Sequence, residues 1–275
     1  MFSRSLRIAS LAGVAASFLL VGFDTASAEI VRMGGTGSSM ELLRKLGSAY
    51  TVENPEVTVE IVPSLGTSGS LRALADGVIG IAVAARPLEP EEAKKGLREV
   101  TSARTPFILV TSRPNPDPMK TADVAAAFAK PEPTWSDGEP LRVLLRPESE
   151  SDTLLLQEFF PGMDEALKKA RSRSEIPVAA TDQDNIAAAE EIPGSLASAT
   201  LLQIKTEGRD LRPIPIDGIE PTLKNFEAGR YRYGKTLHFV ISEKSSPAAD
   251  GFAIFLSSEA AAVLMRESGI LPAGQ

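Results

Sequence analysis

The sequence contains no cysteine and a single histidine, His238. Disulfide bonds, thiol chemistry and zinc sites built from cysteine and histidine are therefore excluded. Aromatic residues make up only 5% of the 275 residues, so we do not expect a ligand pocket walled by aromatic rings. The net charge of -7 leaves no general excess of basic residues, which argues against nucleic acid as a partner.

The first 28 residues have the three parts of a secretory signal. Arg4 and Arg7 precede the apolar stretch Ile8–Phe23, and Ala26–Ala28 fits the small-x-small cleavage pattern. The apolar stretch is about 16 residues long, shorter than the roughly 20 that cross a bilayer. We therefore predict export to the periplasm with cleavage after Ala28, and an uncleaved membrane anchor is the alternative.

After residue 28, short β-type runs alternate with helical patterns. This order predicts an α/β fold in which mainly parallel sheets are flanked by crossover helices. Strands are predicted at Glu29–Met33, Val57–Val62, Ile79–Ala84, Phe107–Thr111, Leu141–Leu145, Pro177–Thr181, Ser195–Leu201 and Thr236–Ser242. Helices are predicted at Met40–Asn54, Leu71–Asp76, Thr121–Ala129, Leu154–Phe160, Asp164–Arg173, Asp184–Glu191, Asn225–Ala228, Pro247–Ser257 and Glu259–Arg266.

Two breaks in this pattern predict a division into two lobes. The proline-rich stretch Arg113–Pro118 is one boundary, and the linker-like segment Asp210–Pro221 is the other. The predicted organisation is a signal peptide (1–28), the first part of lobe I (29–112), lobe II (113–210) and a return segment with the rest of lobe I (211–275). We expect a monomer.

Three loops share one design, in which a strand ends, glycine or hydroxyl residues follow, and a helix begins. They are Gly35–Ser39, Gly66–Ser70 and Arg146–Thr153. The start of a helix has unpaired N–H groups and a partial positive charge, so it favours anions. Ordinary helix capping explains any one loop. Together with Arg146, whose guanidinium can bind an oxyanion through two hydrogen bonds, they predict a small-oxyanion site between the lobes.

At these loops the chain resembles the phosphate-binding component of bacterial phosphate ABC transporters, within the type II periplasmic binding proteins. The similarity covers most of the chain after residue 28. The segments that carry it are Gly35–Ser39, Gly66–Ser70 with Ala85–Leu88, Trp135 with Leu141–Arg146, Ser151–Thr153, Pro193–Ser195, and Asp217–Thr222 with Gly229–Tyr231.

The resemblance implies a two-lobed clamshell that encloses a dehydrated oxyanion, phosphate first, and delivers it to an ABC transporter permease. It implies a binding protein without a cofactor, not an enzyme. The ligand-binding residues that we carry over are Gly37, Ser38, Ser39, Thr67, Ser68, Gly69, Arg146, Ser151, Asp152 and Thr153.

The chain departs from the family pattern at three points. Asp152 stands where the family has glycine, Ala84–Arg86 stands where it has an acid that accepts the ligand's proton, and Gly80 stands where it usually has an aspartate. Glu148 could fill that role, or it could be a solvated acid paired with the site arginine. Arg86 is a further candidate contact, or it pairs with Glu89 on the surface.

Two other functions remain open. A sensory or scavenging protein of the same fold would have the same sequence features. An exported serine hydrolase would need His238 in a catalytic triad, and Gly66–Gly69 lacks the full Gly-x-Ser-x-Gly motif. We expect His238 to be a hydrogen-bonded structural residue, and Asp182 and Asp184 to cap the helix that follows them.

Overall fold

The computed structural model describes residues 29–63 and 65–273, and the predicted signal segment lies outside them. The strands are Glu29–Gly35 (β1), Val57–Val62 (β2), Ile81–Ala84 (β3), Leu97–Thr111 (β4), Arg142–Val143 (β5), Ser195–Thr200 (β6), Arg212–Pro213 (β7), Gly234–Ser242 (β8) and Leu271–Pro272 (β9). The helices are a 3-10 turn at Gly37–Ser39 (η1), then Met40–Glu53 (α1), Gly66–Ala75 (α2), Pro90–Ala93 (α3), Thr121–Ala129 (α4), Ser151–Phe159 (α5), Met163–Arg171 (α6), Asp182–Glu191 (α7), Leu201–Glu207 (α8), Leu223–Glu227 (α9), Pro247–Phe255 (α10) and Glu259–Glu267 (α11).

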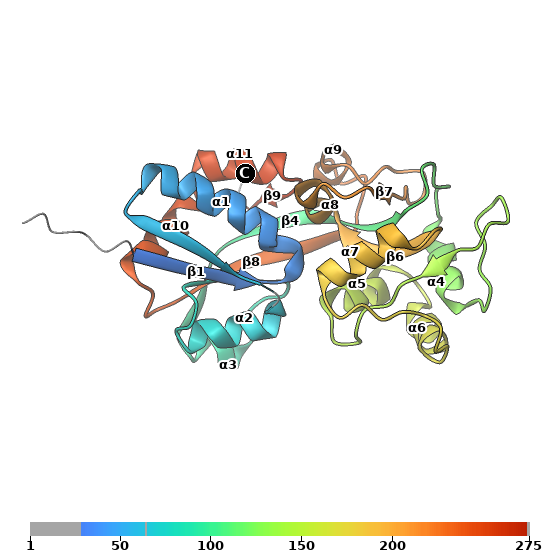
Figure 1. The fold of residues 1–275 in the computed structure, drawn as a ribbon, viewed down its shortest axis with the longest axis horizontal. Coiled ribbons are helices and arrows are strands. Elements are labelled where there is room, and N and C mark those ends of the chain that lie inside the picture. The colour runs from blue at the N-terminus through green and yellow to red at the C-terminus, as the bar shows by residue number, and fades with distance from the viewer. Residues whose placement is uncertain (1–28, 64, 274–275) are drawn as a thin grey trace, which may run out of the picture.

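The strands join in the order β2-β1-β3-β8-β4-β6-β5, with β7 and β9 attached to β4. The pairs β1–β2, β1–β3 and β5–β6 are parallel, as the alternating pattern predicts. The long strands β4 and β8 are antiparallel to their neighbours and connect the two halves of the molecule (Figure 1). The α/β class is confirmed, and the complete sheet is mixed.

Strand β4 is much longer than its sequence indicates. Only Phe107–Thr111 is apolar enough to predict a strand, yet β4 begins at Leu97. Its first part pairs with β8 from Leu97 opposite Ser242 to Pro106 opposite Gly234. The sequence of this part is polar and contains a proline, so it does not indicate a strand by itself. It is extended because it pairs with β8, which lies over 120 residues later in the chain.

Helices cover both faces of the first half of the sheet. In β3, Ile81 and Val83 pack with α1, α10 and α11, while Ala82 and Ala84 pack with α2 on the opposite face. Successive side chains of a strand point to opposite faces, so a strand that is covered on both sides is apolar throughout. This arrangement helps to fix the carboxyl ends of β1 and β2, after which the first two glycine loops begin.

The buried residues form two main clusters that meet within β4 and at the start of β8. Ala103 and Leu237 belong to the cluster of the first half, whereas Phe107 and Tyr233 belong to that of the second. The second cluster also contains Leu211 and Ile214. The chain therefore passes from one core to the other close to residue 105 and returns close to residue 235. The lobe boundaries at 112/113 and 210/211 stay a prediction.

Other differences from the sequence prediction are local. The segment Gly66–Ser70 is the first turn of α2, so the helix begins before the predicted start at Leu71. Helix α8 was not predicted, and the predicted strand Pro177–Thr181 is reduced to one bridge between Val178 and Leu145. Among the described residues no single helix is long and apolar enough to cross a membrane, and only α10 and α11 taken together are, with a 66° bend between them.

Candidate anion-binding site

The first glycine loop closes over the carboxyl end of β1 as the turn η1. Ser38 and Ser39 are buried, and the amide of Ser38 donates a hydrogen bond of 2.8 Å to Oδ2 of Asp182. The hydroxyl of Thr36 donates to the same oxygen at 3.3 Å. A Cβ at Gly37 would lie 2.7 Å from this carboxylate oxygen, so only glycine permits this close approach.

Arg146 reaches the same carboxylate from the other half of the molecule. It follows β5 and is only 4% exposed. One terminal nitrogen donates to the carbonyl of Ala179 at 2.7 Å, and the other to Oδ1 of Asp182 at 3.0 Å. The first loop and the predicted site arginine are thus brought together, and a carboxylate of the protein lies between them.

Asp182 was expected to cap α7, and this expectation is wrong. The cap is Thr181, whose hydroxyl accepts from the amide of Asp184, while the Asp184 side chain accepts from the amide of Thr181. Because this reciprocal pair satisfies the start of the helix, the carboxylate of Asp182 is free to point at the first loop. Ser38 and Asp182 are 144 residues apart, so no local sequence signal predicts their contact.

In the third loop, the side chains of two predicted ligand contacts, Asp152 and Thr153, bind other groups of the protein. Asp152 is buried in the first turn of α5, and its Oδ1 accepts from Nζ of Lys235 at 2.6 Å. The hydroxyl of Thr153 donates to the carbonyl of Pro147 at 2.9 Å. Lys235 was missed by the sequence analysis, and the only hint of it was the aspartate at a glycine position of the family pattern. At Asp152 and Thr153 only the backbone N–H groups remain for a ligand.

The charges of this region form one cluster. Two cations, Arg146 and Lys235, are surrounded by three acids, Asp182, Asp152 and Glu150. Burial by itself would lower the pKa of Lys235, but Asp152 and Asp182 raise the pKa above the ordinary lysine value and keep the ammonium charged. Burial raises the pKa of Glu150, and Arg146 offsets this only in part.

The second loop lies on an open cleft of about 410 Å³ beside this cluster. Gly66–Gly69, in the first turn of α2, lines one side together with Ala85 and Arg86. Ser149–Ser151, at the start of α5, lines the other side. Two helix starts therefore face the same space, which favours an anion.

Within the cleft, Thr67 accepts from the amide of Ala85 at 2.9 Å through its hydroxyl, and Ser68 is exposed. Glu150 connects the cleft to the charged cluster, because its carboxylate lies 3.4 Å from a terminal nitrogen of Arg146. Of the predicted contacts, Thr67, Ser68, Gly69 and Ser151 line the cleft, while Gly37, Ser38, Ser39, Arg146, Asp152 and Thr153 belong to the buried part next to it.

The two further candidates, Arg86 and Glu148, differ in their surroundings. Arg86 lines the cleft, forms two hydrogen bonds of 2.8 Å with Glu92, and also lies 3.4 Å from the carboxylate of Glu89, the partner that was considered. The side chain of Glu148 is 81% exposed and lies 3.4 Å from Nε of Arg171. Glu150, rather than Glu148, is therefore the glutamate next to Arg146.

His238 lies in β8, and its Nδ1 is 2.8 Å from a carboxylate oxygen of Glu99. This contact agrees with the structural role expected for it. In the part of the chain that the structure describes, no group of three histidine, aspartate or glutamate side chains could hold a metal ion.

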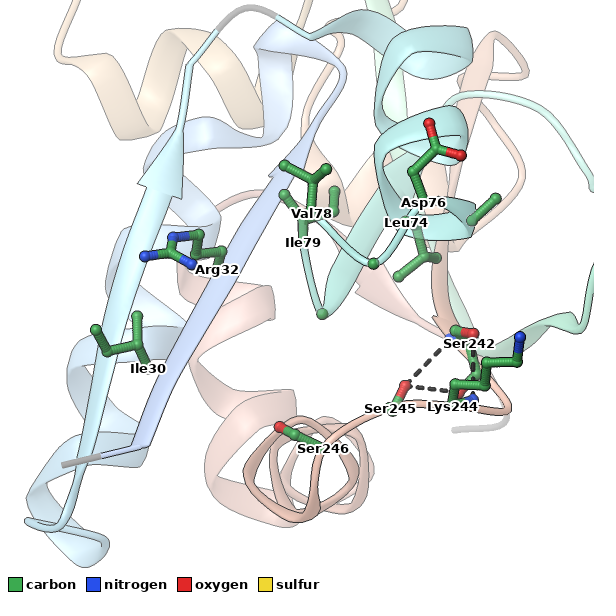
Figure 2. Close-up of a pocket in the computed structure, with 13 residues that line it drawn as sticks. Ile30, Arg32, Leu74, Asp76, Val78, Ile79, Ser242, Lys244, Ser245 and Ser246 are labelled. Carbon is green, nitrogen blue, oxygen red and sulfur yellow. Dashed lines mark hydrogen bonds between the residues drawn. The ribbon is translucent and has the colours of Figure 1, made fainter. Parts of the chain in front are cut away.

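A separate pocket of about 340 Å³ lies at the opposite end of β1 and β3 (Figure 2). Ile30 and Arg32 line it from β1, and Ser242 and Ser245 line it from the end of β8. The guanidinium of Arg32 pairs with Glu60 at 2.9 Å on the surface. This pocket shares no residue with the predicted anion site.

Comparison with known proteins supports the reading of the fold. The family model described as a PBP superfamily domain matches residues 24–260. Phosphate-binding protein PstS 2 of Streptococcus pneumoniae is 31% identical over 101 residues, which cover 37% of this chain and 34% of that protein. Protein SphX of Synechococcus elongatus is 26% identical over 200 residues, or 66% of this chain and 57% of that one. The chain thus spans about a third of the length of the first of these relatives.

Solved structures share the fold at low sequence identity. A Clostridium perfringens protein, assigned as a phosphate ABC transporter substrate-binding protein and solved with phosphate bound, has a TM-score of 0.73 and 17% identity, with 88% of this chain and 99% of that one covered. The periplasmic molybdate-binding protein of Azotobacter vinelandii has a TM-score of 0.58 and 13% identity, with 88% and 98% covered. The expected resemblance to phosphate-binding proteins and the binding-protein architecture are confirmed.

Proposed function

Since this chain belongs to the PBP superfamily, we propose that it captures a small oxyanion, phosphate first, between its two halves and delivers it to the permease of an ABC transporter. The observation that carries the proposal is the meeting of Ser38 and Arg146 on one carboxylate. An N–H group of a glycine loop and a buried guanidinium are donors that suit an oxyanion, and here they already hold an anionic group.

The cleft beside this contact supports the proposal. The first turns of α2 and α5 line it from the two halves of the molecule, so closure would place their free N–H groups around one ligand. The strands β4 and β8 run through both cores, and we propose that the hinge lies where they pass from one core to the other. We propose that the chain acts as a receptor and not as a catalyst, because the groups gathered at the cleft are hydrogen-bond donors that suit the binding of an anion.

The names of the relatives favour phosphate as the ligand and a transporter as the partner. The aligned region of PstS 2 is a minor part of that protein, so both remain proposals for this chain. We also propose that the chain is exported, that Ala28 precedes the cleavage site, and that the protein works as a monomer. Mass spectrometry of the exported protein would identify its first residue.

Calorimetric titration of the purified protein tests the function. Phosphate, sulfate, molybdate, tungstate and acetate are titrated separately at one pH and ionic strength. We expect one site per chain, with the tightest binding for a tetrahedral oxyanion and phosphate preferred. If none of these oxyanions binds, or if acetate binds as tightly as the best of them, the proposed function is wrong.

A further inference from the structure

We propose that Asp182 is an internal ligand of the anion site, so that an oxyanion binds only by displacing its carboxylate. This inference rests on the proposed function and concerns the selectivity of the same site. The carboxylate accepts from the amide of Ser38, the hydroxyl of Thr36 and the guanidinium of Arg146. An amide, a hydroxyl and a guanidinium are the donors that a bound oxyanion would use.

The position of Asp182 is not required by its own helix. Thr181 and Asp184 already cap α7, so the Asp182 side chain has no capping role. It is 7% exposed and extends away from its helix to a loop in the other half of the molecule. A buried carboxylate needs donors for both of its oxygens, and here they come from both halves. Asp182 therefore connects the two halves of the molecule.

Two donors next to this carboxylate are left over. Over residues 29–63 and 65–273, the buried Ser38 hydroxyl and the buried Nε of Arg146 have no hydrogen-bond partner. The two oxygens of the Asp182 carboxylate accept from Thr36, Ser38 and Arg146 and leave these two donors without a partner. A tetrahedral anion has up to four oxygens and could satisfy these donors as well. The arrangement therefore favours a tetrahedral oxyanion over a carboxylate.

Selectivity follows from competition. A tethered carboxylate is present at a high effective concentration, so an incoming anion has to form more or stronger contacts than Asp182 forms. Acetate and chloride offer no more charge or oxygens than the internal group, whereas phosphate and sulfate offer more of both. Asp182 is thus a specificity-determining residue that lowers the affinity for every anion and excludes the weakest ones.

The test compares Asp182→Asn with wild type by calorimetry, using inorganic phosphate, sulfate and acetate as probes. The matched control is Glu191→Gln, which removes an exposed acid from the far end of the same helix and leaves its N-terminal cap and the first loop untouched. We expect Asp182→Asn to bind phosphate and sulfate at least about tenfold more tightly and to gain measurable binding of acetate. Glu191→Gln should bind all three probes as wild type does.

The outcomes separate this inference from the proposed function. If wild type binds phosphate or sulfate and Asp182→Asn binds it equally or more weakly, Asp182 is not a competitor and only this inference is wrong. If neither protein binds any of the oxyanions, the proposed function fails.

A structure of wild type with the best oxyanion bound provides a second test that does not depend on the folding of a variant. We expect the Asp182 carboxylate to have left the amide of Ser38 and an oxygen of the ligand to have replaced it. A complex in which the contact between Asp182 and Ser38 persists would overturn the inference.

Discussion

The first and second glycine loops have similar sequences, Gly-Thr-Gly-Ser-Ser and Gly-Thr-Ser-Gly-Ser, but they are in different states. The amide of Ser38 in the first loop is buried and bound to Asp182. The second loop is the first turn of α2, and Ser68 is exposed on the cleft. Both loops follow a parallel strand of the same sheet. The difference shows that a loop suited to an anion can be satisfied by the protein itself when a distant carboxylate reaches it.

The site therefore has a closed part and an open part. The closed part contains Ser38, Arg146 and Asp182, together with the buried pair of Asp152 and Lys235. The open part is the cleft between the starts of α2 and α5. We expect changes in the closed part to affect both stability and binding, and changes in the open part to affect binding alone.

The largest expected effect is on stability, in the closed part. Lys235→Met would leave the carboxylate of Asp152 buried without its cation, and loss of one partner of a buried pair typically costs about 3–5 kcal/mol. Denaturant unfolding should show this decrease in the free energy of unfolding. The control, Lys244→Met, changes an exposed lysine and should have little effect.

The double variant Lys235→Met with Asp152→Asn would then recover much of the loss, because no unpaired charge remains. If the single variant is destabilised by less than about 1 kcal/mol, the pair is not the buried interaction described here.

The next effect is on affinity. Arg146→Ala should weaken oxyanion binding by at least about 1.5–3 kcal/mol, the scale of a hydrogen bond to a charged group. Calorimetry measures this change, and Arg142→Ala, which removes an exposed arginine from β5, is the control. Arg146→Lys should restore affinity only in part, because an ammonium cannot replace the guanidinium fork. Unchanged affinity in Arg146→Ala would place the ligand in the open part alone.

A smaller effect is expected in the open part. Ser68→Ala removes a hydroxyl from the cleft and should lower the affinity by about 0.5–1.5 kcal/mol, with unchanged stability. Ser48→Ala, at an exposed position of α1, is the matched control for both measurements. A loss of stability in Ser68→Ala would show that the two parts are not as separate as proposed.

The smallest expected effect is the change of oxyanion affinity with pH. Burial raises the pKa of Glu150, so this side chain takes up a proton at a higher pH than an ordinary glutamate. The neutral form removes a negative charge from the cleft, and oxyanion affinity should therefore rise as the pH falls through this raised pKa. The side chain is 38% exposed, so screening by solvent keeps the effect to about threefold or less.

Sulfate is the suitable probe, because hydrogen sulfate is a much stronger acid than a glutamate side chain, so the charge of sulfate stays constant while Glu150 titrates. Glu150→Gln should bind sulfate more tightly than wild type near neutral pH, and the difference should disappear at pH values below the raised pKa of Glu150. Identical pH profiles for the two proteins would remove Glu150 from the site.

Much of the fold follows from local patterns in the sequence. The alternation of strands and helices predicts the α/β class, and the bounds of Val57–Val62 and Thr121–Ala129 agree with β2 and α4. Apolar side chains at a period of 2 or 3.6 indicate such elements directly. The first part of β4 and helix α8 lack a clear period and were missed.

The site could be predicted only in outline. The glycine loops and Arg146 carry local signals, namely a helix start and a cation after a buried strand. Asp182 and Lys235 carry none, because each acts through a partner far away in the chain, 144 residues from Ser38 and 83 residues from Asp152. Sequence reasoning could propose the donors of an anion site but not the group that occupies them.

The sequence by itself determined most of the elements and the glycine loops at the ends of strands, and it predicted the chemistry of a small-oxyanion site, since these depend on hydrogen bonds and side chains within a few residues. The tertiary structure alone decided that the second loop lines an open cleft, whereas the first loop is bound to the carboxylate of Asp182. That choice depends on where folding places two acids and a lysine relative to the loops, and the pairing of buried charges is settled by distances in space and not by neighbours in the chain.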